Sequence, residues 1–265
     1  MPFLRSDDAE IAYEIAGSGP PVVLLHPFPA HRRFWSPILP ALISRYRVIV
    51  PDLRGHGQSE IGQGPAWMEK HARDLMRLLD EARVEKAAFA GVSIGGYILF
   101  EFWRRFRERV QALAICDSRP QADTSEAHAN RLKAASEVIE RGTGAFLDAL
   151  VPRLMGTSTS ARRPDLVAEA RLMMNEMSPE DVSLVQRGMA ARPDSVTDLK
   201  TINVPTLIII GEEDVLSPPA DGELMRRHIS GSRLTIVPKA GHYAPWERPE
   251  EVGRALRQFF DEAVR

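Results

Sequence analysis

The sequence predicts an α/β fold in which helices cover both faces of a mostly parallel sheet and a helical segment is inserted between two strands. Three observations lead to this prediction. Short apolar runs alternate with helical patterns over most of the chain, as in a parallel sheet that is buried on both faces. Residues 118–200 interrupt this alternation with helical patterns alone. The length of 265 residues suits one large domain that carries an insertion.

Seven segments are predicted to be strands. Residues 10–17 alternate polar and apolar side chains and end at the turn sequence GSGPP, which indicates a hairpin-like stop. The other six segments are near-continuous apolar runs, as expected of strands that are buried on both faces. They are residues 22–26, 46–50, 86–92, 110–116, 206–210 and 233–237.

Helical patterns lie between these strands and after the last of them. They are residues 31–44, 65–83, 94–108, 218–229 and 249–264. The last of them begins with a proline and two glutamates, from Pro249 to Glu251. Proline fits the first position of a helix, and acidic side chains interact favourably with the positive end of the helix dipole.

Residues 118–200, between the fifth and sixth predicted strands, are predicted to contain helices and no strand. The helices are expected at residues 124–141, 144–154, 163–176 and 179–191. We therefore expect residues 1–117 and 201–265 to form the core and residues 118–200 to form a helical cap. Methionine suits adaptable binding surfaces but also fills gaps between packed helices, so both roles are open for the cap methionines. These are Met155, Met173, Met174, Met177 and Met189.

The composition excludes several classes of protein. The formal net charge of −2 gives no basic excess for binding nucleic acid, and no apolar run is long enough to span a membrane. The single cysteine, Cys116, excludes an internal disulfide and a cysteine-based metal cluster. The first ten residues have no apolar signal region. We expect a cytoplasmic protein with no metal and no cofactor, and the sequence does not fix its oligomeric state.

A candidate nucleophile lies in the sequence GVSIG at residues 91–95, which has the pattern G-x-S-x-G. It follows a predicted strand and opens a predicted helix, the context in which this pattern forms a sharp turn around a reactive serine. The residues two before and two after the serine approach each other in such a turn, so both must be small. Gly91 and Gly95 meet this requirement, and we predict that Ser93 is a nucleophile.

A serine nucleophile needs a general base and an acid that orients the base. We choose His242 as the base, because it follows the predicted strand 233–237 where a loop leaves the carboxyl end of the sheet. Two further histidines follow Ser93 in the sequence, His128 and His228. The first lies in the cap and the second near a helix end, and we expect both to be solvated.

Asp214 is our choice for the acid, because it follows the strand 206–210 on the same edge of the sheet as Ser93. Glu212 and Glu213 compete with it by position. Asp117, which follows the strand 110–116, is a further candidate that reaches the same histidine from a neighbouring strand. Cys116 is expected to be a small buried side chain.

The site also needs two N–H donors for an oxyanion. One is the N–H of Ile94, directly after the nucleophile. The other is expected from the loop HPFP at residues 26–29, in which both prolines lack an N–H group, so we choose Phe28. His26 is expected to hold this loop. The segment DLRGHGQS at residues 52–59 is expected to be a braced, glycine-kinked loop.

With these motifs in order, the chain resembles the α/β-hydrolase superfamily over nearly its whole length. The resemblance rests on HPFP, DLRGHGQS, GVSIGG, GEED and GHYAPWERP, at residues 26–29, 52–59, 91–96, 211–214 and 241–249. It implies an eight-stranded sheet, a catalytic triad at its carboxyl edge and a helical cap. Many members have His-Gly where this chain has His26-Pro27; the donor in those members is the residue after the glycine, so the resemblance still implies Phe28.

The chain is similar to carboxylesterases, 3-oxoadipate enol-lactonases, acyl-homoserine-lactone lactonases and cofactor-free haloperoxidases or perhydrolases. The resemblance implies hydrolysis of a carboxylic ester through an acyl-serine. The alternatives are a lactonase, a perhydrolase and a ligand receptor with vestigial hydrolysis. We expect a small-molecule ester or lactone as the substrate, and neither nucleic acid nor a membrane as a partner.

The substrate is expected to bind between the cap and the sheet, against Phe28, because ligands in open α/β sheets bind at the carboxyl edge. The methionines and leucines of the cap favour small to medium-sized, uncharged substrates. Arg153, Arg162 and Arg163 offer another interpretation, in which they bind a substrate carboxylate instead of being solvated surface groups.

Overall fold

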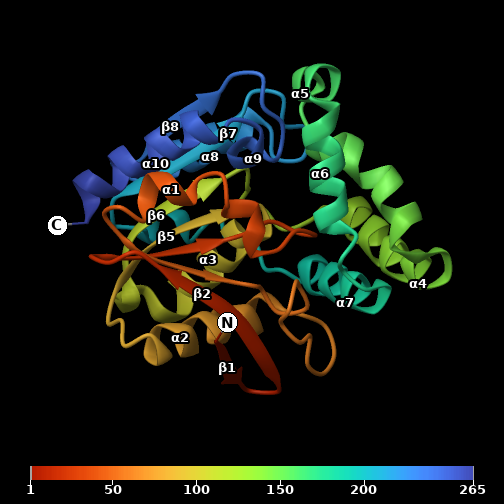
Figure 1. The fold of residues 1–265 in the computed structure, drawn as a ribbon, viewed down its shortest axis with the longest axis horizontal. Coiled ribbons are helices and arrows are strands. Elements are labelled where there is room, and N and C mark those ends of the chain that lie inside the picture. Colours follow the sequence, from red (N-terminus) through yellow and green to blue (C-terminus); the bar gives the residue numbers. More distant parts are fainter. Residues whose placement is uncertain (1, 265) are drawn as a thin grey trace.

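The computed structural model describes residues 2–264 and contains one eight-stranded sheet with helices on both faces (Figure 1). The predicted fold class is confirmed. The strands are β1 (Phe3–Ser6), β2 (Ala9–Ala16), β3 (Pro21–Leu25), β4 (Arg47–Pro51), β5 (Ala87–Val92), β6 (Val110–Cys116), β7 (Thr206–Gly211) and β8 (Arg233–Val237).

The order of the strands is β1-β2-β4-β3-β5-β6-β7-β8, and all neighbouring pairs from β4 to β8 are parallel. Strand β2 is antiparallel to both of its neighbours, β1 and β4. The predicted hairpin-like stop after β2 is therefore wrong, since β2 and β3 are not adjacent. Strand β1 was not predicted; it has four residues and pairs with β2 alone.

The helices of the core are α1 (Leu39–Leu42), α2 (Met68–Glu81), α3 (Ile94–Phe106), α8 (Pro219–His228), α9 (Ala244–Glu247) and α10 (Pro249–Ala263). Helices α2, α3 and α8 cover one face of the sheet, and α1 and α10 cover the other. Each face has its own apolar cluster, one beneath α2, α3 and α8 and the other beneath α1 and α10. Successive residues of a strand point to opposite faces, so Val23 and Leu25 belong to the first cluster and Val22 and Leu24 to the second. Burial on both faces explains the continuous apolar runs.

Two further sequence predictions differ from the structure. The expected helix at residues 31–44 is broken into a 3₁₀ turn at Arg32–Trp35 and the short α1, because Pro37 and Pro40 cannot donate hydrogen bonds inside a helix. Strand β8 is not buried on both faces: it lies at the edge of the sheet, and Ile236 is 37% exposed.

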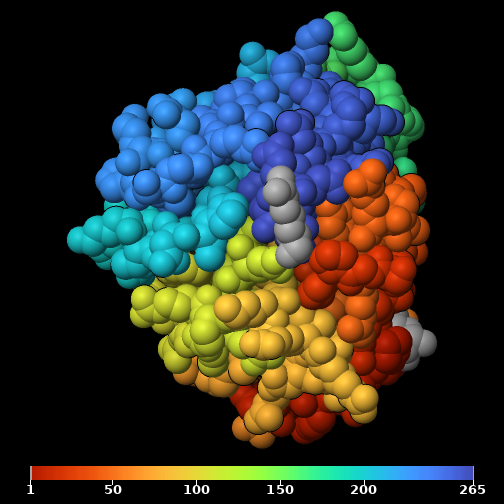
Figure 2. All heavy atoms as spheres, turned by 90° about the vertical axis from the view of Figure 1, so that its left-hand side faces the viewer, coloured from red at the N-terminus to blue at the C-terminus, as the bar shows by residue number. Residues whose placement is uncertain are grey.

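Between β6 and β7 lie four helices, α4 (Ser125–Leu154), α5 (Thr157–Arg162), α6 (Pro164–Met174) and α7 (Pro179–Ala190). Figure 1 shows them gathered at one end of the sheet, and the view from the opposite end shows their green segments only at the rim of the molecule (Figure 2). Helix α4 has a non-helical residue at Gly142, with φ of 80°, where a break between two helices was expected. Helix α5 was not predicted.

A buried histidine under the sheet affects how stability depends on pH. His71 of α2 is 1% exposed, and within residues 2–264 neither of its ring nitrogens has a hydrogen-bond partner. Burial lowers the pKa of His71 well below its usual range, so the folded protein holds this ring neutral. An unpartnered buried polar group reduces stability.

We expect His71→Leu to raise the free energy of unfolding by about 1 kcal/mol at pH 7.5. The gain should grow as the pH falls below about 6.5, where the unfolded chain binds a proton on this histidine and the folded chain does not. Each pH unit adds up to about 1.4 kcal/mol. Urea unfolding at pH 7.5 and 5.5 measures both effects. The exposed His228, changed to Gln, is the control, and a destabilised Leu variant at both pH values would contradict the prediction.

Candidate active site

The loop between β5 and α3 holds Ser93 in a backbone conformation that few residues other than glycine adopt, with φ of 54° and ψ of −112°. The turn is so tight that its flanking residues must be glycine. A Cβ atom on Gly91 would lie 2.6 Å from the carbonyl carbon of Gly95, and one on Gly95 would lie 2.8 Å from the carbonyl oxygen of Leu25. The G-x-S-x-G spacing is thus explained by contacts between backbones.

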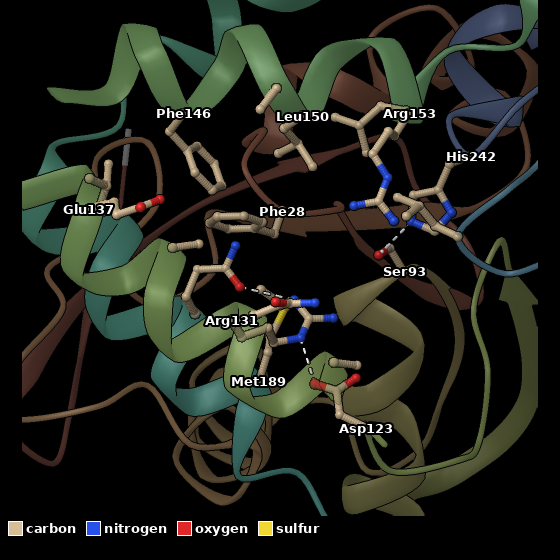
Figure 3. Close-up of a pocket in the computed structure, with 18 of the residues that line it drawn as sticks. Phe28, Ser93, Asp123, Arg131, Glu137, Phe146, Leu150, Arg153, Met189 and His242 are labelled. Carbon is tan, nitrogen blue, oxygen red and sulfur yellow. Dashed lines mark hydrogen bonds and ion pairs between the residues drawn. The ribbon is translucent and has the colours of Figure 1, made fainter. Parts of the chain in front are cut away.

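Ser93, His242 and Asp214 lie in one hydrogen-bonded chain. The Nε2 atom of His242 is 2.8 Å from Ser93 Oγ, and its Nδ1 atom is 2.8 Å from Asp214 Oδ2 (Figure 3 shows the first contact). All three side chains are buried. The carboxylate is itself held, because Asp214 Oδ1 accepts hydrogen bonds from the N–H groups of Leu216 and Ser217 at 2.8 and 2.9 Å.

This geometry suits proton transfer from the serine hydroxyl. A carboxylate at Nδ1 keeps the proton on that nitrogen, so that Nε2 is free to accept the proton of Ser93. The same carboxylate stabilises the imidazolium that forms when His242 is protonated. The three residues chosen from the sequence are brought together in the order that this chemistry requires.

The other carboxylates considered for the acid lie elsewhere. Asp117 is fully buried, and its two oxygens accept hydrogen bonds from the N–H groups of Gly211 and Ala244 at 2.8 and 3.2 Å. It joins the strand before Asp214 to the helix after His242. Burial, together with the charge of Asp214, raises the pKa of Asp117 well above its usual range.

Glu212 and Glu213 point away from the histidine. Glu212 accepts a hydrogen bond from the N–H of Lys239 at 3.1 Å. Glu213 accepts from the hydroxyl of Thr157 at 2.9 Å and from the N–H of Ser158 at 2.8 Å, so it binds the start of α5 to the core. These carboxylates position loops and do not contact His242.

Glu247 is a residue that the sequence reasoning missed. Its side chain is buried and accepts hydrogen bonds from the N–H of Gly156 at 3.0 Å and from the N–H of Gly241 at 2.8 Å. It therefore connects the segment after α4 to the loop that carries His242. Burial raises the pKa of Glu247. The only sequence signal for it is its place in the segment WERP that follows the histidine.

Phe28 and Ile94 present the backbone N–H groups chosen for an oxyanion. Within residues 2–264 neither N–H donates to a protein acceptor. The N–H of Ile94 belongs to the first turn of α3, where N–H groups have no acceptor in the helix and the helix dipole is positive. The carbonyl of Phe28 accepts a hydrogen bond from the Tyr243 hydroxyl at 3.0 Å, which fixes the loop.

His26 stabilises the loop of Phe28 through two hydrogen bonds. Its Nε2 accepts a hydrogen bond from the N–H of Leu53 at 2.8 Å, and its Nδ1 donates to the carbonyl of Pro27 at 3.0 Å. Burial lowers the pKa of His26 well below its usual range, and this keeps the ring neutral and able to accept. The ring lies between the loops 26–29 and 52–59.

A cavity of about 420 Å³ opens above Ser93 and His242, between the core and helices α4 and α7 (Figure 3). This volume is in the lower part of the range for small-molecule sites. Phe28, Tyr97 and Leu216 line its core side. The cap side mixes apolar and charged residues, among them Phe146, Leu150, Met189, Glu137, Arg131, Arg141 and Arg153.

The five cap methionines divide between the two roles that the sequence left open. Met189 lines the cavity, whereas Met155, Met173, Met174 and Met177 are buried in the two apolar clusters. They fill space between helices, the other role open to them. Of the three arginines proposed from the sequence, Arg153 lines the cavity and Arg162 and Arg163 do not.

The part of the chain that the structure describes contains neither a group of side chains suited to a metal ion nor a helix suited to span a membrane. In residues 2–264 no three His, Cys, Asp or Glu side chains are grouped so that they could hold a metal ion. Over the same residues, every helix is too short or too polar to span a lipid bilayer.

Comparisons with known proteins agree with this geometry. An esterase from Thermogutta terrifontis, in a structure with malate bound, is 39% identical; the match covers 97% of this chain and 95% of the esterase, with a TM-score of 0.94. The enol-lactonase of Burkholderia xenovorans LB400 is 27% identical, over 98% and 100% of the two chains, with a TM-score of 0.91. "Putative carbamate hydrolase RutD" of Azorhizobium caulinodans is 30% identical over 99% of both chains.

The family model of the alpha/beta hydrolase fold matches residues 20–249. This range contains the five motifs on which the sequence resemblance rests, so the resemblance is confirmed. The protein belongs to the alpha/beta hydrolase fold family and is a hydrolase of that fold.

Proposed function

We propose that the protein hydrolyses carboxylic esters, including lactones, of small to medium-sized substrates through an acyl-Ser93 intermediate. The observation that carries this proposal is the hydrogen-bonded chain from Ser93 through His242 to Asp214 at the floor of a cavity. We also propose that residues 118–200 act as the cap of this site and that residues 1–117 and 201–265 form its core.

In the first half of the reaction, Ser93 Oγ attacks the carbonyl carbon and His242 Nε2 takes the hydroxyl proton. The N–H groups of Phe28 and Ile94 stabilise the oxyanion of the tetrahedral intermediate. His242 then gives the proton to the leaving alkoxide, which departs as the alcohol. In the second half, His242 takes a proton from water as the water oxygen attacks the acyl carbon. The bond between this carbon and Ser93 Oγ then breaks, His242 returns the proton to Ser93 Oγ, and the acid is released.

The names of the relatives support a reaction at a carbonyl carbon bonded to oxygen. The names esterase, enol-lactonase and putative carbamate hydrolase all refer to substrates with such a group, and the lactonase favours the inclusion of cyclic esters. Two alternatives use the same serine. If peroxide replaces water in the second half of the reaction, the protein is a perhydrolase. If Ser93 is acylated once and the acyl group is not released, the protein is a ligand receptor.

We expect Ser93→Ala to lower kcat for 4-nitrophenyl acetate by about three orders of magnitude or more, because the acyl intermediate cannot form. A fluorophosphonate probe should label the wild-type protein at Ser93 and leave this variant unlabelled. The exposed Ser136, changed to Ala, is the matched control and should keep full activity. Near-normal turnover by Ser93→Ala would overturn the proposal. Labelling of the wild type without multiple turnovers would favour the receptor.

A second test separates the two candidate acids, Asp214 and Asp117. Asp214→Asn should lower kcat by several orders of magnitude at an unchanged melting temperature, because the amide no longer holds His242 in the reactive tautomer. Asp117→Asn loses one acceptor for two buried N–H groups, so it should lower stability by about 1–3 kcal/mol and kcat much less. Steady-state kinetics and thermal unfolding measure both. The opposite pattern would make Asp117 the acid.

A further inference from the structure

The cavity above Ser93 has an excess of positive charge. Four arginines line it, and the acidic residues in its lining are two, Asp123 and Glu137. The arginines are Arg119, Arg131, Arg141 and Arg153. Glu137 already lies 3.8 Å from a lysine outside the lining, Lys133. The cavity therefore has more cationic groups than its own acids can neutralise.

The negative charge of Asp123 is already paired with nearby arginines, so it does not neutralise Arg141 or Arg153. Its side chain is 1% exposed and contacts three guanidinium groups, those of Arg131 at 2.7 Å, Arg192 at 2.8 Å and Arg119 at 3.4 Å. The contacts with Arg192 and Arg131 lower the pKa of Asp123 despite its burial. Three cations around one buried carboxylate leave this end of the cavity cationic.

Arg141 and Arg153 have no carboxylate within 4 Å among residues 2–264, in contrast to Arg163 on the outside of the cap, which pairs with Asp165 at 2.9 Å. Arg153 lies in the last turn of α4, across the cavity from the nucleophile. In Figure 3 its guanidinium points from α4 toward Ser93 and His242. The residue is exposed, so that a ligand entering the cavity can reach it.

We propose that the substrate carries a carboxylate in addition to the scissile ester, and that Arg153 binds it. This inference rests on the proposed function and names its substrate class: half-esters of short dicarboxylic acids, or lactones that bear a carboxylate. A guanidinium binds a carboxylate through two parallel hydrogen bonds, which would fix the distance between the carboxylate and the scissile carbonyl. The inference departs from the sequence-based expectation of uncharged substrates and develops the alternative interpretation, in which Arg153 binds a substrate carboxylate.

Arg153 also serves a second purpose in the proposed reaction. A substrate carboxylate close to the reacting carbonyl repels the negative charge that develops on the oxyanion. A cation beside that carboxylate offsets the repulsion, and the effect is stronger in a partly enclosed cavity than in water. A neutral ester gains nothing from Arg153, so the site should discriminate between charged and neutral esters of the same shape.

The test compares monomethyl succinate, glutarate and adipate with neutral methyl esters of the same shape, such as methyl 5-methylhexanoate for the glutarate. Hydrolysis is followed by titration of the released acid at constant pH. We expect a higher kcat/KM for the best half-ester than for its neutral partner. Arg153→Gln should lower the ratio of the two kcat/KM values at least ten-fold, through a higher KM and a lower kcat for the half-ester, and Arg153→Lys should restore part of it.

Arg163→Gln is the matched control, because Arg163 lies outside the cavity on the same cap, and it should leave the ratio unchanged. Free glutarate should inhibit the wild type competitively and Arg153→Gln more weakly. A wild-type preference for neutral esters, or an equal loss for both substrates in Arg153→Gln, would overturn the carboxylate proposal while neutral-ester turnover through Ser93 stands. Ser93-independent turnover of every ester would instead overturn the proposed function.

Discussion

The contact of His242 with both Ser93 and Asp214 is the constraint on which the rest of the structure depends. The two partners are 149 and 28 residues away in the sequence, yet each lies 2.8 Å from a ring nitrogen. Parallel strands make this possible, because β5, β7 and β8 all end at the same edge of the sheet and each delivers one loop to it. Proton transfer tolerates little error in these distances, so the three loops must be rigid.

Buried polar side chains supply that rigidity. Asp117 and Glu247 each accept two backbone hydrogen bonds from different loops, and His26 joins the loop of Phe28 to the next one. Backbone N–H groups buried without a partner would destabilise the fold, so these side chains stabilise one arrangement of the loops. Glu247 and Glu213 also attach the inserted helices to the core, so that the cavity and the reactive histidine share the same supports.

The fold and the reacting residues could be predicted because their signals are local. The apolar runs of the parallel strands and the spacing of Gly91, Ser93 and Gly95 follow from contacts between a few residues. The edge position of β8 and its exposure depend on the order of strands, which no short pattern encodes. Glu247 was missed for a related reason: its two hydrogen-bond partners, Gly156 and Gly241, come together only in three dimensions.

The composition of the cavity shows most clearly where sequence patterns stop being informative. On both sides of the kink at Gly142, residues of α4 at spacings of three and four line the cavity, so one face of each half of α4 forms its wall. These faces carry Arg131, Glu137 and Arg153 beside apolar residues such as Phe146 and Leu150, and in a sequence charged residues at these spacings are typical of a helix side turned to solvent. A polar helix face over a nucleophile and one over bulk water have the same pattern. Only the cavity between α4 and the sheet distinguishes them, and it selects Arg153 from the three arginines that the sequence offered for binding a substrate carboxylate.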